Sequence, residues 1–419
     1  MLVRRTDTLI LGAGLQGTAV ALELARRGLR VTLMDAEPRA MNRASLRSEA
    51  KIHLGFIYAK DRSLASAFLQ IDGALRFRAI LARWVGRSSR WLALSTPFHY
   101  LVAKDSIVAP DRLAEHYAAV EERCCRQLEQ DAKLDYLGAR PERLVRPLTD
   151  REIAAHFDAE RFAAGFSTVE RAVDADKLLA CLRRAIASSP NITFLPSHVA
   201  RTLTEESDGF RVEGDGALGT WCVRAHQLVN ATWERRLVLD QQLGIPPPRD
   251  LLHRLKFRVV ARLPADLRGA PSVSMVLGRY GDIVIRPDGT AYLSWYPAGL
   301  RGWSHDLEPP AAWDPACRGE VAPAVARGVA ADMLAGIDAW FPGVARCEPL
   351  LVDAGVIVAI GRSDVDDAAS GLHDRSSIGV TSRGGYHSLN TGKLTTAPLF
   401  AIQTADRVEA LQLARRAAS

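Results

Sequence analysis

The sequence predicts an α/β fold, with a doubly wound sheet that carries an inserted antiparallel, β-rich domain. Three observations lead to this expectation. The chain opens with a strand, a glycine-rich turn, a helix and a second strand. Residues 251–296 contain a series of short β-branched segments that turn residues separate. The length of 419 residues exceeds what one hydrophobic core usually supports.

The opening unit has clear local signals for each of its elements. Residues 6–11 (TDTLIL) are apolar and β-branched, as in a buried strand. Residues 18–27 have apolar positions at helical spacing, and Gly28 follows in the position where helices commonly end. Residues 30–34 (RVTLM) predict the second strand. Together they indicate the β-α-β unit of a Rossmann-like domain.

The turn between the first strand and the helix is GAGLQG, which is typical of a pyrophosphate site. Gly12 allows the tight turn, Gly14 lets the backbone approach the pyrophosphate, and Gly17 lets the helix pack against the strand. The helix start offers free N–H groups and a partial positive charge to phosphates. Asp35 is placed to accept ribose hydrogen bonds and argues against a 2′-phosphate. Leu15, Gln16 and Ala36 complete the residues expected here. A glycine-rich turn without a ligand is the alternative.

The rest of the chain alternates between predicted helices and strands. Helices are expected at 63–85, 111–130, 149–157, 174–188, 322–340 and from about 391 to the end. Strands are expected at 91–102, 165–173, 251–261, 272–277, 281–286, 290–296 and 349–360, with several more before residue 231. Thr149 and Glu152 form a capping-box pattern.

These elements suggest a discontinuous division of the chain into two domains. Residues 1–90, 150–240 and 345–419 are expected to form a cofactor-binding domain, and residues 91–149 and 241–344 a substrate or cap domain.

Composition is that of an ordinary soluble globular protein, with 48% hydrophobic and 24% charged residues. The net charge of +6 comes mostly from arginines scattered along the chain, so no nucleic-acid partner is expected. The six cysteines form no CxxC pair, which indicates free thiols in a cytoplasmic protein and no metal site. The chain enters its first strand almost at once, and no apolar run is long enough for a transmembrane segment, so neither a signal peptide nor a membrane span is expected.

A second segment with cofactor chemistry, GGYHSLNTGKLTTAP, lies at residues 384–398. A reduced flavin carries negative charge at one edge of its ring, and a helix start with a lysine suits that charge. Asn390 or Thr391 would cap the helix, Gly392 would allow close approach, and the turn at Lys393 would face the ring together with Leu394 and Thr395. A capped surface helix is the alternative.

The segment AKIHLGFIY resembles a region of the D-amino-acid oxidase (DAO) superfamily of FAD enzymes. The pattern is nearest to the L-2-hydroxyglutarate and glycerol-3-phosphate dehydrogenase branches, in which a Ser-rich turn precedes an Ile-His-x-Gly stretch beside the flavin. LVNATW, at 228–233, also resembles a superfamily strand near the pyrophosphate. The resemblance implies FAD as cofactor, and contacts to it from Ser45, Lys51, Ile52, His53, Val199, Ala231, Thr232, Gly361, Gly385, Tyr386 and His387.

The resemblance also implies candidate catalytic residues. Beside a flavin, His53 could act as a base, tune the ring or carry a covalent link, and a packing role is the alternative. His387 is a second candidate base. Arg286 and Tyr296 lie in the β-rich block, which in this superfamily covers the flavin and holds a substrate carboxylate.

The expected function is an FAD-dependent oxidoreductase that oxidises a small polar substrate at a CH–NH or CH–OH carbon, by hydride transfer to flavin N5. A hydroxyl substrate needs a positioned base, whereas an amine does not. The electron acceptor (oxygen, a quinone or a carrier) stays open. The alternatives are an NAD-dependent dehydrogenase and a non-catalytic or RNA-modifying flavoprotein.

Overall fold

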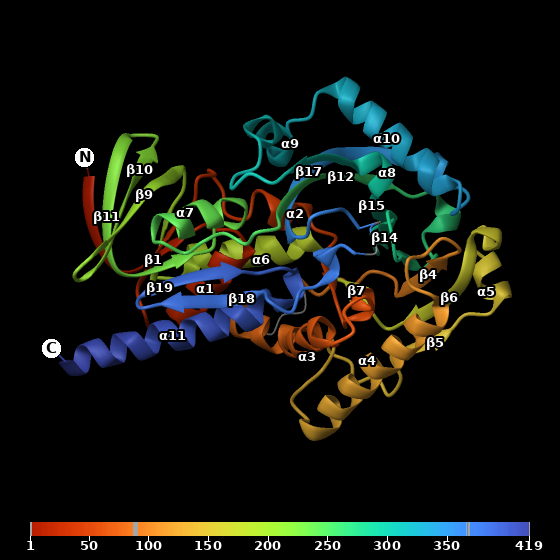
Figure 1. Cartoon of the computed structure of the whole chain (residues 1–419), viewed down its shortest axis with the longest axis horizontal. Coiled ribbons are helices and arrows are strands. Elements are labelled where there is room, and N and C mark those ends of the chain that lie inside the picture. The colour runs from red at the N-terminus through yellow and green to blue at the C-terminus, as the bar shows by residue number, and fades with distance from the viewer. Residues whose placement is uncertain (1, 87–90, 366, 368, 419) are drawn as a thin grey trace.

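The computed structural model of the chain describes residues 2–86, 91–365, 367 and 369–418. Within this part of the chain, the strands form two large sheets and a small pair (Figure 1). Helices lie against the faces of both large sheets. This mixed α/β architecture confirms the predicted fold class.

The first sheet is centred on the opening strand β1 (Leu2–Leu11), and its strands lie side by side in the order β18-β19-β11-β1-β2-β8. Strand β1 pairs in parallel with β2 and β11, β2 pairs in parallel with β8, and β11 pairs in parallel with β19. The remaining members are β2 (Val31–Met34), β8 (Ile192–Leu195), β9 (His198–Glu206), β10 (Gly209–Gly216), β11 (Gly219–Asn230), β18 (Gly379–Arg383) and β19 (Tyr386–Asn390). The parallel centre reflects the crossover helices that connect its strands.

Four long helices pack around the first sheet. They are α1 (Leu15–Arg26), α3 (Ala65–Val85), α6 (Ala175–Ser188) and α11 (Ala397–Ala418). Helix α1 is buried from Leu15 to Ala25, and its apolar side chains join those of α3, α6 and α11 in one core. The first and last helices of the chain are therefore packed together.

The second sheet has the order β16-β12-β15-β14-β13-β4-β6-β5, and β17 pairs with β12. Its pairs are antiparallel except that β13 runs parallel to β4. The strands are β4 (Phe98–Ala103), β5 (Val145–Pro147), β6 (Phe162–Thr168), β12 (Leu251–Arg262), β13 (Ser272–Val276), β14 (Gly281–Ile285), β15 (Thr290–Trp295), β16 (Leu300–Ser304) and β17 (Glu348–Ile360). Helix α10 (Pro323–Asp338) covers its apolar outer face.

The shorter elements connect these layers. They are the two-stranded pair β3 (Lys51–Ile52) and β7 (Arg171–Ala172), and the helices α2 (Ala44–Arg47), α4 (Pro110–Gln130), α5 (Asp150–Ala154), α7 (Arg236–Gln242), α8 (Tyr296–Gly299) and α9 (Asp314–Arg318). The capping box at α5 is confirmed, because Thr149 Oγ1 accepts from Glu152 N while the Glu152 carboxylate accepts from Thr149 N.

Several predicted boundaries were wrong. The last helix begins at Ala397 rather than near Thr391, because a 3-10 turn over Leu394–Thr396 precedes it. The strand predicted at 91–102 begins only at Phe98, after Pro97. The predicted strand 165–173 is two separate strands, β6 and β7.

The division into domains remains a proposal. Boundaries at 150 and 345 would separate β6 and β17 from the sheet to which they belong. We propose that the second domain also takes in these two strands.

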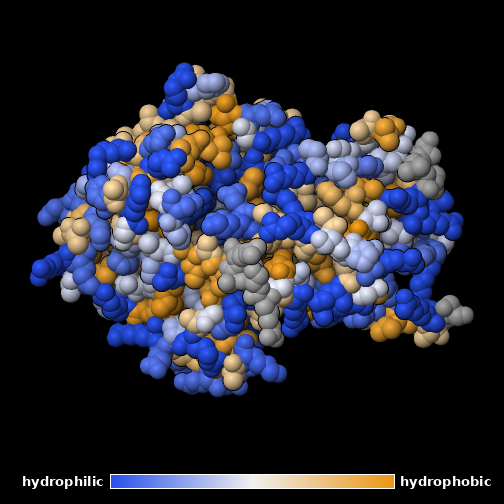
Figure 2. Space-filling model, turned by 180° about the vertical axis from the view of Figure 1, so that it is seen from behind, coloured by the Kyte–Doolittle hydropathy of each residue, from blue (hydrophilic) through white to orange (hydrophobic). Residues whose placement is uncertain are grey.

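The surface of the molecule is largely hydrophilic on the face that Figure 2 draws. Figure 2 shows polar side chains over most of one face, with smaller apolar patches between them. Within the described residues, none of the helices has both the length and the apolar character that crossing a bilayer requires. All six cysteines are unpaired, as expected.

Candidate active site

One cavity of about 540 Å³ is lined by both ends of the chain. We call it the glycine-turn cavity. Its lining includes Gly12, Gly14, Leu15, Gln16, Asp35, Ala36, Ser45, Val199, Ala231, Thr232, Gly392, Lys393 and Leu394, all of which the sequence predicted as cofactor contacts. A direct hydrogen bond also joins the two ends, because Gln16 Nε2 donates to Ala397 O over 3.2 Å. The predicted convergence of the two segments on one cavity is therefore observed.

The glycine turn has the geometry that a diphosphate needs. Gly12 has φ +92°, and a Cβ there would lie 2.5 Å from Ala231 O. A Cβ at Gly17 would lie 1.9 Å from Gly12 O, so only glycine lets the helix pack this closely. At Gly14, by contrast, a Cβ would have only ordinary contact with Ser45 Oγ at 3.5 Å among described atoms. Its Cα therefore faces open space in the cavity, where a ligand can approach the backbone.

The start of α1 lacks a side-chain cap from its own N-cap residue, Gly14. Ser45 Oγ accepts from Leu15 N at 2.9 Å. The other N–H groups of the first turn have no partner within the helix and can serve an anion. The carboxylate of Asp35 lies beside the glycine turn, where it accepts hydrogen bonds from Ala13 N and Glu37 N. Burial raises the pKa of Asp35 to about 6, although these two hydrogen bonds act in the opposite direction.

Ion pairs hold α9 across the rim of the glycine-turn cavity. Arg43 donates to Glu234 at 2.7 Å and to Asp314 at 2.8 Å, and Arg318 donates to Glu37 at 3.0 Å. No local sequence signal predicts that α9 covers the cavity, because the α9 segment follows strand β16 of the second sheet and reaches the cavity only through long-range packing.

Next to the other end of the cavity lies a polar cluster of buried and half-buried side chains, which we define as Glu49, His53, Tyr58, Lys256, Tyr296, Arg375 and Lys393. Lys393 lines the glycine-turn cavity, and its Nζ lies 3.4 Å from Glu49 Oε1. Glu49 Oε1 is in turn 3.5 Å from His53 Nε2. These contacts connect the cavity to His53.

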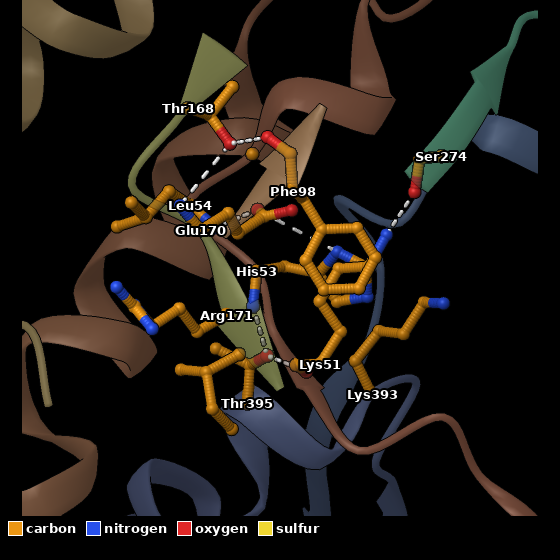
Figure 3. A network of polar contacts seen from close by, with 12 residues as sticks. Lys51, His53, Leu54, Phe98, Thr168, Glu170, Arg171, Ser274, Lys393 and Thr395 are labelled. Atoms are coloured by element: carbon orange, nitrogen blue, oxygen red, sulfur yellow. Dashed lines mark hydrogen bonds and ion pairs between the residues drawn. The ribbon is translucent and has the colours of Figure 1, made fainter. Parts of the chain in front are cut away.

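His53 is 2% exposed and has the carboxylates of Glu49 and Glu170 within 4 Å of its ring nitrogens; Figure 3 labels His53 and Glu170. Its Nδ1 is 3.9 Å from Glu170 Oε1, and within the described residues neither ring nitrogen has a hydrogen-bond partner. Burial lowers the pKa of His53, and the charge of Lys393 adds to this. The imidazole is therefore held neutral and free to accept a proton.

The backbone of His53 is fixed by two other predicted segments. Thr395 Oγ1 accepts from His53 N at 2.9 Å, and Glu170 accepts from Leu54 N at 2.6 Å and from the Tyr100 hydroxyl. Thr395 thus positions His53, although the sequence placed it against the flavin. Figure 3 shows these bonds meeting around the short strand β3.

The far side of the cluster is cationic. Lys256 Nζ lies 4.6 Å from the centre of the Tyr296 ring, and Arg254 lies 5.8 Å from the same ring. Arg375 is 9% exposed, and its guanidinium donates to Val358 O at 3.3 Å. Burial lowers the pKa of Arg375. This direction is expected for a buried guanidinium that forms no ion pair with a carboxylate among the described residues.

Opposing effects act on the charges of Lys393 and Glu49. Burial alone would lower the pKa of Lys393, but the Glu49 carboxylate outweighs it, so the pKa is raised. Burial alone would raise the pKa of Glu49, but Lys393 and its neighbours hold it well below the usual range. Both groups are therefore charged at neutral pH.

Other predicted site residues lie away from the glycine-turn cavity. Lys51 Nζ contacts Ser274 Oγ and lies 3.1 Å from Asp282 Oδ1, so it faces the second sheet. Ile52 is fully buried in β3. Gly361 N donates to Asp250 O at 2.6 Å, and Gly385 packs against His226 O. We therefore do not carry these four forward as cofactor contacts.

Three further predicted residues have structural partners. The Tyr386 hydroxyl donates to Asp240 at 2.6 Å. His387 pairs with Ser382 at 2.9 Å and with Gln227 at 3.2 Å, so its ring is engaged inside the first sheet rather than at the cavity. Burial lowers the pKa of His387 to about 4. Arg286 lies at the turn between β14 and β15. We withdraw His387 and Arg286 as catalytic candidates, while Tyr296 keeps its place in the cluster.

The sequence interpretation overlooked Lys256 and Arg375. A signal for Lys256 was present, because Arg254, Lys256 and Arg258 occupy alternate positions of an otherwise apolar strand. Such alternation places all three on one face of β12. Arg375 had no such signal, since it ends the acid-rich segment 361–375.

The comparisons with known proteins identify the family and the fold. The profile of the family described as DAO, FAD dependent oxidoreductase, matches residues 7–407. No curated protein sequence matches the chain.

Solved structures match over nearly the whole chain. Glycine oxidase from Geobacillus kaustophilus has a TM-score of 0.70 at 18% identity, over 97% of this chain and 95% of its own. Iminodiacetate oxidase from Chelativorans sp. BNC1 has a TM-score of 0.64 at 18% identity, over 96% and 95%. L-alpha-glycerophosphate oxidase from Mycoplasma pneumoniae, solved with FAD bound, has a TM-score of 0.62 at 16% identity, over 98% and 95%. At these identities the structures show a shared fold. With the family match, they confirm the predicted resemblance, and the chain belongs to the DAO family of FAD-dependent oxidoreductases.

Proposed function

We propose that this enzyme oxidises a small 2-hydroxy acid to the 2-oxo acid, with the substrate held in the polar cluster. The observation that carries the proposal is the buried imidazole of His53, whose ring nitrogens have no hydrogen-bond partner among the described residues, in one cluster with Lys256 and Arg375, which both lie near Tyr296. A base and an anion site within one cluster match the two functional groups of such an acid.

The proposed placement of the cofactor follows the glycine-turn cavity. The diphosphate of FAD would lie at the start of α1, and Lys393 would lie beside the flavin ring. Bound FAD supplies the two-electron acceptor for the substrate C–H bond. Val199, which also lines the cavity, suits the adenine end.

In the proposed reaction, Arg375 and Lys256 bind the substrate carboxylate and hold its C2 toward the cavity. Guanidinium groups bind carboxylates through paired charge-assisted hydrogen bonds. His53 takes the hydroxyl proton as the C2–H bond breaks, so that the C–O bond becomes a carbonyl. Glu170 and Thr395 fix the backbone beside His53, and Glu170 faces its Nδ1.

Oxidation of an amine-bearing acid is the second candidate, because glycine oxidase and iminodiacetate oxidase share this fold. All three relatives named above are called after compounds that carry a carboxylate or phosphate group, which agrees with a cationic pocket. In an amine reaction His53 would not be required as a base.

A substrate panel separates the two candidates. The purified holoenzyme would be mixed anaerobically with 2-hydroxy acids and with the matching 2-amino acids, and loss of the flavin absorbance band would be followed. The proposal predicts bleaching by at least one hydroxy acid. Bleaching by amino acids alone would replace it with the amine reaction, and bleaching by neither would remove both.

Variants test the anion site in the same assay. Arg375→Gln should raise KM by about 10²-fold, since a hydrogen-bonded charge contributes about 1.5–3 kcal/mol. Arg362→Gln is the matched control, because Arg362 is 84% exposed and pairs with Asp250 at the surface. Equal KM values in the two variants, at normal flavin content, would exclude Arg375 from substrate binding.

A further inference from the structure

A second cavity, of about 570 Å³, lies within the part of the molecule built on the second sheet. We call it the rear cavity. It is lined by Lys104, Asp105, Ile107, Arg161, Met275, Gly278, Arg279, Tyr280, Trp295, Pro297, Gly336 and Trp340. Its volume falls within the range of about 300–1,000 Å³ that small-molecule sites occupy. The proposed reaction uses none of these residues.

The rear cavity lies on the opposite face of the second sheet from the polar cluster. Met275 and Trp295 line it, whereas their chain neighbours face the other way. Ser274 contacts Lys51, and Tyr296 lies over Lys256. Successive side chains of a strand point to opposite faces, which explains this division. Part of the lining comes from β15, α8 and α10, which Figure 1 labels.

Aromatic rings form one wall of the rear cavity. The Tyr280 and Trp295 rings have centroids 6.4 Å apart at 34°, and those of Trp295 and Trp340 are 6.0 Å apart at 37°. Glycines make room for them. A Cβ at Gly278 would lie 2.7 Å from the Tyr280 ring, and one at Gly336 would lie 2.5 Å from Trp295 Nε1. The wall is therefore a fitted aromatic surface rather than a gap between loops.

The wall also contains an unused hydrogen-bond donor. Trp340 is 2% exposed, and within the described residues its Nε1 has no hydrogen-bond partner. Buried indole N–H groups normally find an acceptor. The acid of the lining, Asp105, already accepts from the Tyr280 hydroxyl at 2.6 Å.

Two cations stand together in the lining. Lys104 N donates to Arg161 O at 3.1 Å, so β4 and β6 hold the two residues side by side. Lys104 Nζ lies 4.0 Å from Glu160, and Arg161 Nε lies 3.2 Å from Asp158. Both ion pairs are solvent-exposed, and such pairs contribute little and exchange readily for a better anion.

We propose that the rear cavity binds a small planar aromatic acid. The aromatic wall takes the ring of the ligand, and Lys104 and Arg161 take its carboxylate. A neutral arene would lack the charge contact, and an aliphatic acid would lack the stacking, so both should bind more weakly. This site is independent of the proposed hydroxy-acid oxidation.

The test uses the holoenzyme and 2-naphthoate as probe, with binding measured by titration calorimetry. 2-Naphthalenemethanol and cyclohexanecarboxylate serve as the neutral and the aliphatic comparison. The expected result is one saturable site for 2-naphthoate that is at least about tenfold tighter than for either comparison compound. Absence of saturable binding up to millimolar concentration, or equal affinity for all three compounds, would overturn the proposal.

Variants locate the site. The double variant Lys104→Gln with Arg161→Gln should bind 2-naphthoate about tenfold more weakly. Lys133→Gln with Arg146→Gln is the matched control, since it removes the same charges from exposed positions outside the cavity, and it should bind normally. Arg375→Gln should also bind normally. Loss of binding in that variant would place the probe in the substrate site and contradict the inference.

Discussion

Substitution of Gly14 separates cofactor binding from folding, because of the three turn glycines only this one has room for a side chain within the protein. A Cβ at Gly14 has ordinary contact with Ser45 Oγ at 3.5 Å, whereas Cβ atoms at Gly12 and Gly17 would lie 2.5 Å and 1.9 Å from backbone oxygens. Gly14 has φ −64° and ψ −178°, a conformation that valine adopts easily. Gly14→Val should therefore fold.

The expected loss of cofactor affinity follows from two contributions. The added methyl groups would occupy the place of the diphosphate, and overpacking of this kind costs about 1–3 kcal/mol. Displacing the phosphates from the helix N–H groups removes charge-assisted hydrogen bonds of about 1.5–3 kcal/mol. Together they amount to about 2.5–6 kcal/mol, which corresponds to an FAD complex about 10²- to 10⁴-fold weaker. Folding stability should change by only about 1 kcal/mol, the typical cost of a poorer N-cap residue.

The assay compares flavin content after purification, FAD titration of the apoprotein and urea unfolding. Gly269→Val is the control, because Gly269 is exposed and a Cβ there would have no described atom within 4 Å. The control should retain FAD fully. Stoichiometric FAD in Gly14→Val would refute the placement of the diphosphate. Unfolding of the variant would refute the claim that a side chain fits at Gly14.

Three further outcomes follow from the charges. Lys393→Met should slow flavin reduction about tenfold while flavin content stays normal, and an unchanged rate would remove Lys393 from the ring environment. The pH profile of kcat/KM should fall only below the ordinary histidine pKa of about 6.5, because burial and Lys393 lower the pKa of His53, and a fall starting above that value would contradict its role. Burial alone would raise the pKa of Glu23, but hydrogen bonds from Arg26 and its neighbours lower it to about 2, so the free energy of unfolding should decrease by about 2–3 kcal/mol as the pH falls from 4.5 to 2. Glu23→Gln should remove this decrease, and a persistent pH dependence would point to other carboxylates.

The sequence predicted those parts of the site whose positions follow from spacing within one local unit of the chain. The turn glycines and Asp35 belong to one β-α-β unit, whose spacing dictates where each must lie. Ser45 and Val199 came from the family resemblance, and both line the cavity. The cavity itself depends on pairing between α1 and α11, which the sequence suggested only because both ends carried cofactor chemistry.

The residues that the sequence misplaced or overlooked depend on long-range contacts. His387 and Tyr386 follow the family pattern, yet here they join the first sheet to α7 and α11 through hydrogen bonds. Lys51 was itself predicted as a cofactor contact, but its side chain faces Ser274 and Asp282 of the second sheet. Arg375 reaches the cluster from a segment whose composition is that of a solvated loop. Distances across sheets, rather than spacing along the chain, decide these cases.

The most direct test of the account is a crystal structure of the holoenzyme. We expect one FAD molecule in the glycine-turn cavity, with its diphosphate against Gly12–Gly17 and its ring beside Lys393. A flavin bound with its ring elsewhere, or a diphosphate far from the start of α1, would contradict it.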